Sequence, residues 1–309
     1  MAVVICSIRV PPPLRCWPRF YTDFHWPGFF TGKPPLKDRI ITRNAKSSNF
    51  SSSTSTILAC PICYKPLMSR TDPELSSAST SGSGVECYSC KRLYPHNEIY
   101  YDLTIASGLK DYSEPMTVAT ELFRNPLVSF LYERGWRQNF IWGGFPGPER
   151  EFKMALDYLK PTSGVALDFS ESMLQQCHEY NKQENLSKED FVMVRADISR
   201  LPFVANSIDA VHAGAALHCW PSPSTGVAEI SRVLRPGGIF VASTFILDVF
   251  PPAVPVFEAT REYFIRFTGN HLYLSEYELE DLCRSCGLVG FTCMRNGAFV
   301  MFSAAKPNN

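Results

Sequence analysis

The 309-residue sequence lacks several features that mark whole classes of protein. It contains no run of eighteen apolar residues, so it offers no candidate for a membrane-spanning helix. Its 30 basic and 30 acidic residues balance, so it has no overall basic charge to attract nucleic acid. No Gly-x-Gly occurs between Pro148 and Gly237. This stretch therefore lacks the bare glycine turn that brings the backbone close to a cofactor in many folds.

Acids are nearly absent from residues 1–56. The segment holds eight Lys or Arg residues, has only Asp23 and Asp38 as acids, and ends in the hydroxyl-rich run SSNFSSSTST. This composition is typical of an organelle transit peptide, and we interpret residues 1–56 in that way. A disordered tail that the mature protein keeps is the alternative. Removal of the segment would leave about six more acids than bases, which further opposes binding to nucleic acid.

Residues 57–104 contain two Cys-x-x-Cys pairs, Cys60 with Cys63 and Cys87 with Cys90, and 23 residues separate the pairs. Each pair can lie on a tight turn that points both thiolates at one ion, and four sulfur ligands suit tetrahedral zinc. The run SSASTSGSG between the pairs indicates an inserted flexible loop. We therefore predict a zinc-ribbon-like element with a structural zinc. A redox-active dithiol and a ribbon without metal are the alternatives.

A third Cys-x-x-Cys, formed by Cys283 and Cys286, is interpreted differently. It falls inside a predicted helix over Glu276–Cys286, which Gly287 ends as a C-cap. Leu279 shares the helical spacing of these cysteines. Both thiols are therefore predicted to be small residues of the core.

From residue 149 onward, short apolar runs alternate with helical patterns. The runs occupy residues 165–169, 191–194, 208–212 and 239–243. This alternation predicts an α/β fold with a parallel sheet. Asp168 closes the first run, and its carboxylate is expected in the ligand crevice because that crevice lies at the carboxyl ends of parallel strands. Two later runs, 289–294 and 298–304, flank Arg295-Asn296-Gly297 and predict a closing antiparallel hairpin.

Four motifs in this order, VALDF, RADISRLPF, GAALHCW and EISRVLRPGG, resemble class I S-adenosylmethionine (SAM) dependent methyltransferases of the ubiquinone and menaquinone subgroup. The resemblance covers residues 149–307 and implies a Rossmann-like sheet with SAM as cofactor. It implies that Asp168 accepts hydrogen bonds from the ribose hydroxyls and Asp197 from the adenine amine. Ile198 and Leu201 would pack on the adenine ring. His218 would lie near the methyl donor as a base, or would act only as a hydrogen-bonded strut.

The sequence departs from this family in one part. The family begins with a strand and a glycine-rich turn, which receives the methionine half of SAM at a helix N-terminus. Here a predicted helix over residues 149–159 leads through residues 160–163 directly into the strand that ends at Asp168. We infer that the first strand, its turn and its helix, roughly 25 residues, are deleted.

This deletion predicts a truncated methyltransferase domain with weak or lost SAM binding. The strand that ends at Asp168 would then pair directly with the strand that begins near Ile208, or would leave a gap lined by unpaired backbone groups.

The N-terminal part carries two further resemblances. The ribbon, with Tyr94 and the run Ile99–Leu103, is similar to the zinc element of bacterial large-subunit rRNA guanine methyltransferases. Together with the rest of the chain it also resembles plant plastid methyltransferases of unassigned substrate, which implies a chloroplast location. Residues 105–148 are interpreted as a helical lid and connector, with a helix over Met116–Trp142 that closes over the ligands or only packs.

Three functions follow from these patterns. The apolar, proline-broken segment 245–255 favours a SAM-dependent methyltransferase with a small-molecule acceptor such as a quinone, lipid or aromatic compound. Such an acceptor is compatible with peripheral contact with lipid. An rRNA methyltransferase is the second function, and the acidic charge opposes it. The third is a non-catalytic, zinc-stabilised interaction protein.

Overall fold

The computed structural model describes residues 3–7, 57–71, 83–107, 127, 140–147, 150–151, 153–155, 163–183 and 191–308. Most of the predicted transit peptide and most of the predicted helix over 116–142 lie outside these residues. The described part of the predicted helix over 149–159, residues 150–151 and 153–155, is helical. None of the described helices is long and apolar enough to cross a membrane.

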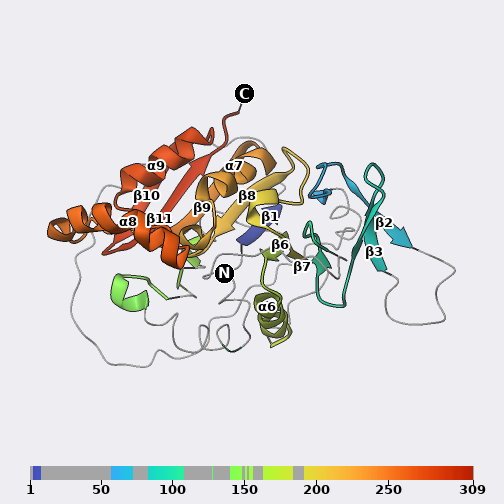
Figure 1. Cartoon of the computed structure of the whole chain (residues 1–309). Coiled ribbons are helices and arrows are strands. Elements are labelled where there is room, and N and C mark those ends of the chain that lie inside the picture. Colours follow the sequence, from blue (N-terminus) through green and yellow to red (C-terminus); the bar gives the residue numbers. More distant parts are fainter. Residues whose placement is uncertain are drawn as a thin grey trace. The chain divides into compact units, whose positions relative to one another are not determined.

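The predicted α/β sheet is confirmed (Figure 1). Its eight strands have the order β10-β11-β9-β8-β1-β6-β7-β5. The neighbours β6 and β7 are parallel, as are β8 and β9 and also β7 and β5. The hairpin of β10 and β11 pairs antiparallel, as its turn sequence predicted, and β11 adds to β9. The bounds are β5 (Tyr101–Asp102), β6 (Ser163–Asp168), β7 (Phe191–Arg195), β8 (Ile208–Ala213), β9 (Leu234–Phe245), β10 (Val289–Asn296) and β11 (Phe299–Ala305).

Helices follow the strands. They are α6 (Glu171–Gln183), α7 (Pro223–Val233), α8 (Val254–Thr268) and α9 (Glu276–Ser285), with short 3-10 turns η2 (Phe140–Gly143), η3 (Ile198–Arg200), η4 (Leu217–Cys219) and η5 (Pro251–Ala253). The helices α7 and α9 each bury an apolar face in the core, whereas α8 has no buried residue. Ser222 caps α7 by accepting a hydrogen bond from the Thr225 amide, and Pro223 opens the helix. The core on this side includes Ile230, Phe240 and Phe302.

The helix α9 confirms the interpretation of the third Cys-x-x-Cys. It begins after the cap residue Ser275 and ends one residue before the predicted boundary, near Gly287 in the left-handed region (φ 80°). Cys283 is buried in the core, and Cys286 packs against it while its thiol donates to the carbonyl oxygen of Ser224 at 3.4 Å. These thiols are therefore structural.

The position between β6 and β8 corrects a prediction from the sequence. Neither direct pairing of β6 with β8 nor an open gap occurs, because β1 (Val3–Ser7) lies between them and runs antiparallel to both (Figure 1, dark blue). Ile5 is paired with Val165 on one side and Val211 on the other. The central position is thus filled by a strand antiparallel to both neighbours, because the facing edges of β6 and β8 offer amides and carbonyls that must be paired inside a sheet.

The ribbon forms a separate three-stranded antiparallel sheet, β2 (Leu67–Thr71), β3 (Ser83–Cys87) and β4 (Arg92–Pro95). Val85 and Tyr94 are buried in its centre. Tyr64 and Lys91, each directly after a Cys-x-x-Cys pair, have positive φ of 57° and 54°. These two sharp turns bring both cysteine pairs to one end of the ribbon.

Candidate functional site

Asp168 lies at the carboxyl end of β6, where the sequence placed it. Its Oδ1 accepts a hydrogen bond from the Ser170 amide at 2.8 Å, and the Ser170 hydroxyl accepts from the Met173 amide at 3.4 Å. The side chain is buried, as is that of Ser170 at the start of α6. Asp168 is therefore held by the strand and the following helix together.

Asp197 follows the neighbouring strand β7, so the structure brings the two predicted ligand-binding carboxylates to adjacent strand ends. The two loops are joined by a bond from the Ala196 amide to the Asp168 carbonyl oxygen at 3.2 Å. Asp197 caps η3 through its Oδ1, which accepts from the Ser199 amide at 2.8 Å. Ile198 is buried and Leu201 is fully buried in the core.

Arg195 is a site residue that the sequence pattern did not reveal. Its Nη1 lies 3.0 Å from Asp102 Oδ2 and 3.1 Å from Glu171 Oε1, and its Nε donates to the Phe169 carbonyl oxygen at 3.2 Å. The guanidinium thus ties β5 and the start of α6 to the loop after Asp168. Its place in the motif RADISRLPF was the available signal, but Asp102 is too distant in the chain to be paired with it by spacing.

His218 is buried in η4 beside the end of β9. Its Nδ1 lies 3.3 Å from Thr244 Oγ1, and its ring packs on Phe245 with the centroids 4.4 Å apart. Its carbonyl oxygen accepts from the His271 amide at 2.7 Å. Burial lowers the pKa of His218 to about 3, so the imidazole is neutral near pH 7. A neutral ring can orient a hydrogen-bond partner, but it holds a transferred proton poorly.

A second polar cluster, also missed by the sequence patterns, gathers at the ends of β8 and β9. The Ser243 hydroxyl donates to Glu151 Oε1 and accepts from the Ala215 amide at 2.7 Å. A Cβ atom added at Gly214 would lie 3.1 Å from His212 Cε1 and 3.5 Å from Glu151 Oε1. A carboxylate, a hydroxyl and an imidazole therefore converge here and are all buried.

The four ribbon cysteines converge as predicted. The sulfur atoms of Cys60, Cys63, Cys87 and Cys90 all lie within 4.8 Å of one another. The Cys63 and Cys87 sulfurs are 3.5 Å apart, and the Cys90 amide donates to the Cys87 sulfur at 3.3 Å. This donor set and its compactness fit a tetrahedral metal centre.

The pKa values of two thiols in this cluster are shifted in opposite directions. Burial raises the pKa of Cys63, but hydrogen bonds from the Lys65 backbone and the neighbouring thiols outweigh it and lower the pKa to about 7. The hydrogen bond with Cys63 raises the pKa of Cys90 to about 12. Without a metal, the Cys63 thiol is thus the more acidic of these two, whereas a bound dication would favour the thiolate form of every ligand.

Comparison with known proteins identifies the family. The family described as "Methyltransferase domain" matches residues 147–242. An uncharacterized chloroplastic methyltransferase of Arabidopsis thaliana is 57% identical over 281 residues, which cover 82% of this chain and 79% of that protein. The chain belongs to the methyltransferase family. A demethylmenaquinone methyltransferase of Staphylococcus aureus is 36% identical to this methyltransferase over 177 residues, 52% of this chain and 70% of its own.

Solved structures give a weaker match. A SAM-dependent methyltransferase of Thermotoga maritima covers 50% of this methyltransferase and 78% of its own chain, at 20% identity and a TM-score of 0.37.

The residues of this methyltransferase fit one half of SAM. The carboxylates of Asp168 and Asp197 are acceptors at adjacent strand ends, which suits adenosine, with two hydroxyls and an amine as donors. The methionine half does not fit. Between the ends of β6 and β8 lies Val3, the start of an antiparallel strand, and not a glycine-rich turn into a helix N-terminus.

Proposed function

We propose that this chain is a plastid methyltransferase, built for SAM and a small apolar acceptor, whose present form cannot hold the methyl donor productively. The main observation behind this proposal is the antiparallel strand β1. It occupies the central position of the sheet, and its direction leaves Val3 where the family has a glycine-rich turn. With β1 in this position, the chain has contacts for the adenosine half of SAM but none that hold its sulfonium.

The proposed roles follow the site geometry. Asp168 holds the ribose hydroxyls, Asp197 holds the adenine amine, and Ile198 packs on the adenine ring. Leu201, which has no exposed surface, supports this loop from the core. His218 orients the acceptor by a hydrogen bond from its neutral ring, which agrees with its lowered pKa better than a role as base. When bound in a complete site, SAM supplies the methyl group for an in-line transfer, so the protein's main contribution is alignment.

The acceptor class is inferred from the surface after β9. Val249 and Phe250 are exposed there, and the adjoining helix α8 exposes Tyr263 and Phe267 without a buried residue of its own. This surface supports a quinone, lipid or aromatic acceptor and a peripheral contact with lipid. The chloroplastic relative supports a plastid location, with residues 1–56 as the transit peptide. Because β1 lies within that segment, the proposal about the donor site concerns the uncleaved 309-residue chain.

The charge of the chain and the position of β1 also bear on the two alternative functions. An rRNA acceptor is opposed by the acidic balance of residues 57–309. A non-catalytic, zinc-stabilised interaction protein is favoured by one observation, the occupation of the central sheet position by β1, which removes the methionine site.

Calorimetric titration of the 309-residue chain tests this proposal. We expect SAM to bind with a dissociation constant of roughly 1 mM or weaker, an affinity of about −4 kcal/mol or less, because only the adenosine half finds partners. Adenosine alone should bind about as well as SAM, and Asp168→Asn should weaken both equally. Micromolar SAM binding would contradict the proposal and would mean that the segment VALDFSES is the glycine-poor first motif of the family.

We propose structural zinc at the four cysteines, with one ion per chain. Metal analysis should show about one zinc per chain, lost in the double variant Cys87→Ser, Cys90→Ser because two of four ligands are removed. Cys286→Ser is the matched control, since this thiol lies outside the cluster and is bonded to Ser224. Equal zinc content in the double variant and the wild type would eliminate the site.

A further inference from the structure

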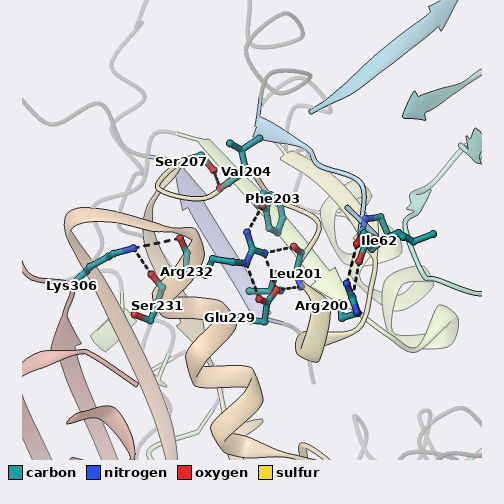
Figure 2. A network of polar contacts seen from close by, with 11 residues as sticks. Ile62, Arg200, Leu201, Phe203, Val204, Ser207, Glu229, Ser231, Arg232 and Lys306 are labelled. Atoms are coloured by element: carbon teal, nitrogen blue, oxygen red, sulfur yellow. Dashed lines mark hydrogen bonds and ion pairs between the residues drawn. The ribbon is translucent and has the colours of Figure 1, made fainter. Parts of the chain in front are cut away.

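The ribbon and the predicted adenine site meet directly. Arg200, the last residue of η3, points its guanidinium at the turn between the first two cysteines (Figure 2). Its Nε donates to the Pro61 carbonyl oxygen at 2.7 Å, and its Nη2 donates to the Ile62 carbonyl oxygen at 3.1 Å. We call residues 60–64 the knuckle and residues 197–204 the adenine loop. One side chain of the adenine loop therefore binds both residues that separate Cys60 from Cys63.

A second arginine holds the other end of the adenine loop. Arg232 of α7 donates to the carbonyl oxygens of Leu201 at 2.7 Å and Phe203 at 2.9 Å (Figure 2). It pairs with Glu229 at 2.7 Å, and Glu229 Oε2 accepts from the Leu201 amide at 2.8 Å. This pair thus fixes both the amide and the carbonyl of Leu201.

The aromatic ring of Tyr64 lies against both arginines. The guanidinium carbon of Arg232 is 4.1 Å from the ring centroid, and that of Arg200 is 5.3 Å from it. Main-chain bonds extend the contact, from the Ala59 amide to the Pro202 carbonyl oxygen at 2.8 Å and from the Val204 amide to the Ile57 carbonyl oxygen at 3.0 Å. The adenine loop is therefore bonded to the ribbon along most of its length.

The position of the knuckle carbonyls depends on the cysteines. Pro61 and Ile62 can present both oxygens to one guanidinium only while the chain makes the tight turn from Cys60 to Tyr64, which has a positive φ of 57°. A bound dication holds that turn by drawing the sulfurs of Cys60 and Cys63 together, and the ordering of such ribbons is coupled to metal binding. Metal loss would therefore release the partner of Arg200.

We propose that the metal-loaded knuckle is the support of the adenine loop, so that metal occupancy at the four cysteines sets the affinity for an adenine nucleoside. Arg200 is the positioning residue that transmits this effect, and Tyr64 with Arg232 is the second contact. The inference rests on the proposed function in two respects, a metal at the cysteines and adenine beside Asp197 and Ile198. It adds a coupling between the ribbon and the ligand site, which makes the ribbon part of the binding machinery.

The test combines metal removal with variants of Arg200, and it reads out zinc content, adenosine affinity and amide hydrogen exchange in residues 197–204. Chelation of the wild type should speed exchange in the adenine loop and weaken adenosine roughly tenfold, a coupling of usual size. Arg200→Ala should retain zinc yet show the same fast exchange and weak binding, and chelation should then change little more. Arg200→Lys should recover part of the affinity, since an ammonium can reach only one carbonyl.

Arg284→Ala is the matched control, because this exposed arginine interacts with Asp281 and Tyr277 on its own helix α9 and not with the knuckle or the adenine loop. It should leave all three readouts unchanged. Unaltered exchange in residues 197–204 after chelation, or in zinc-loaded Arg200→Ala, overturns the inference even where adenosine still binds. Exchange that responds to zinc while no form binds adenosine overturns the proposed adenine site, and the claim about affinity with it.

Discussion

Replacing Ile5 by proline is expected to abolish the cooperative unfolding of the chain. Ile5 is the middle residue of β1 and is paired on both sides, with Val165 of β6 and Val211 of β8. Proline cannot donate a ladder hydrogen bond and is excluded from central strands. Each lost bond costs about 0.5–1.5 kcal/mol and each orphaned buried group about 1–3 kcal/mol. Residue 5 has one amide, so these two terms sum to about 1.5–4.5 kcal/mol. The proline ring adds a steric cost between two paired strands, and together these losses are a large part of the roughly 5–15 kcal/mol that stabilises a whole domain.

Urea unfolding followed by circular dichroism and fluorescence measures this effect. Ile5→Val is the matched control, because it keeps a β-branched residue and the amide, and should retain a single transition with about the same slope. The fragment 57–309, which transit-peptide removal would leave, should behave like Ile5→Pro. Cooperative unfolding of that fragment at the midpoint of the full chain would show that the sheet closes between β6 and β8 without β1.

Restoring the deleted elements should have the second large effect. We expect a family-like strand, glycine-rich turn and helix, inserted at Gly164 between Ser163 and Val165, to tighten SAM binding from millimolar to micromolar, roughly a thousandfold or about 4 kcal/mol. The reason is that a parallel strand would displace β1 and place a helix N-terminus beside Asp168, where the methionine half needs donors. Calorimetry with SAM and a methyl-transfer assay on an apolar acceptor provide the readouts.

A matched insert separates the two contributions of this segment. With each glycine of the turn replaced by valine, the strand and helix should still complete the sheet and raise the unfolding midpoint. SAM affinity should stay millimolar, because side chains would block the approach of the cofactor to the backbone. Equal SAM affinity with both inserts would contradict the role given to the turn.

The parts of this fold that the sequence predicted are those with a local signal. The strands β6 to β9 are short apolar runs with helical patterns between them, and their parallel pairing is confirmed. The turn at Arg295-Asn296-Gly297 predicted the pairing of β10 with β11. The spacing of the cysteines predicted their convergence. In each case a few neighbouring residues specify the structure.

The features that the sequence did not predict depend on partners distant in the chain. β1 consists of five apolar or small residues inside a segment with the composition of a transit peptide, and only the vacancy between β6 and β8 gives it a partner. Arg200 bonds to Pro61, which lies 139 positions away in the sequence, and to Ile62, which lies 138 positions away. Arg195 bonds to Asp102, which lies 93 positions away. An arginine in a motif shows that a cation is present, but its carbonyl and carboxylate partners appear only in the folded chain.

The place of β1 also fixes the order in which the sheet can be completed during synthesis. β1 is the first strand to leave the ribosome, and its two neighbours, β6 and β8, end at Asp168 and Ala213. At about 5–20 residues per second, roughly 10 to 40 s pass before both neighbours exist. During this interval the N-terminal segment has no sheet to join and stays accessible to the factors that recognise a targeting signal. If residues 1–56 are the proposed transit peptide, import and folding would compete for the same five residues, and the faster process would decide whether the chain keeps its central strand.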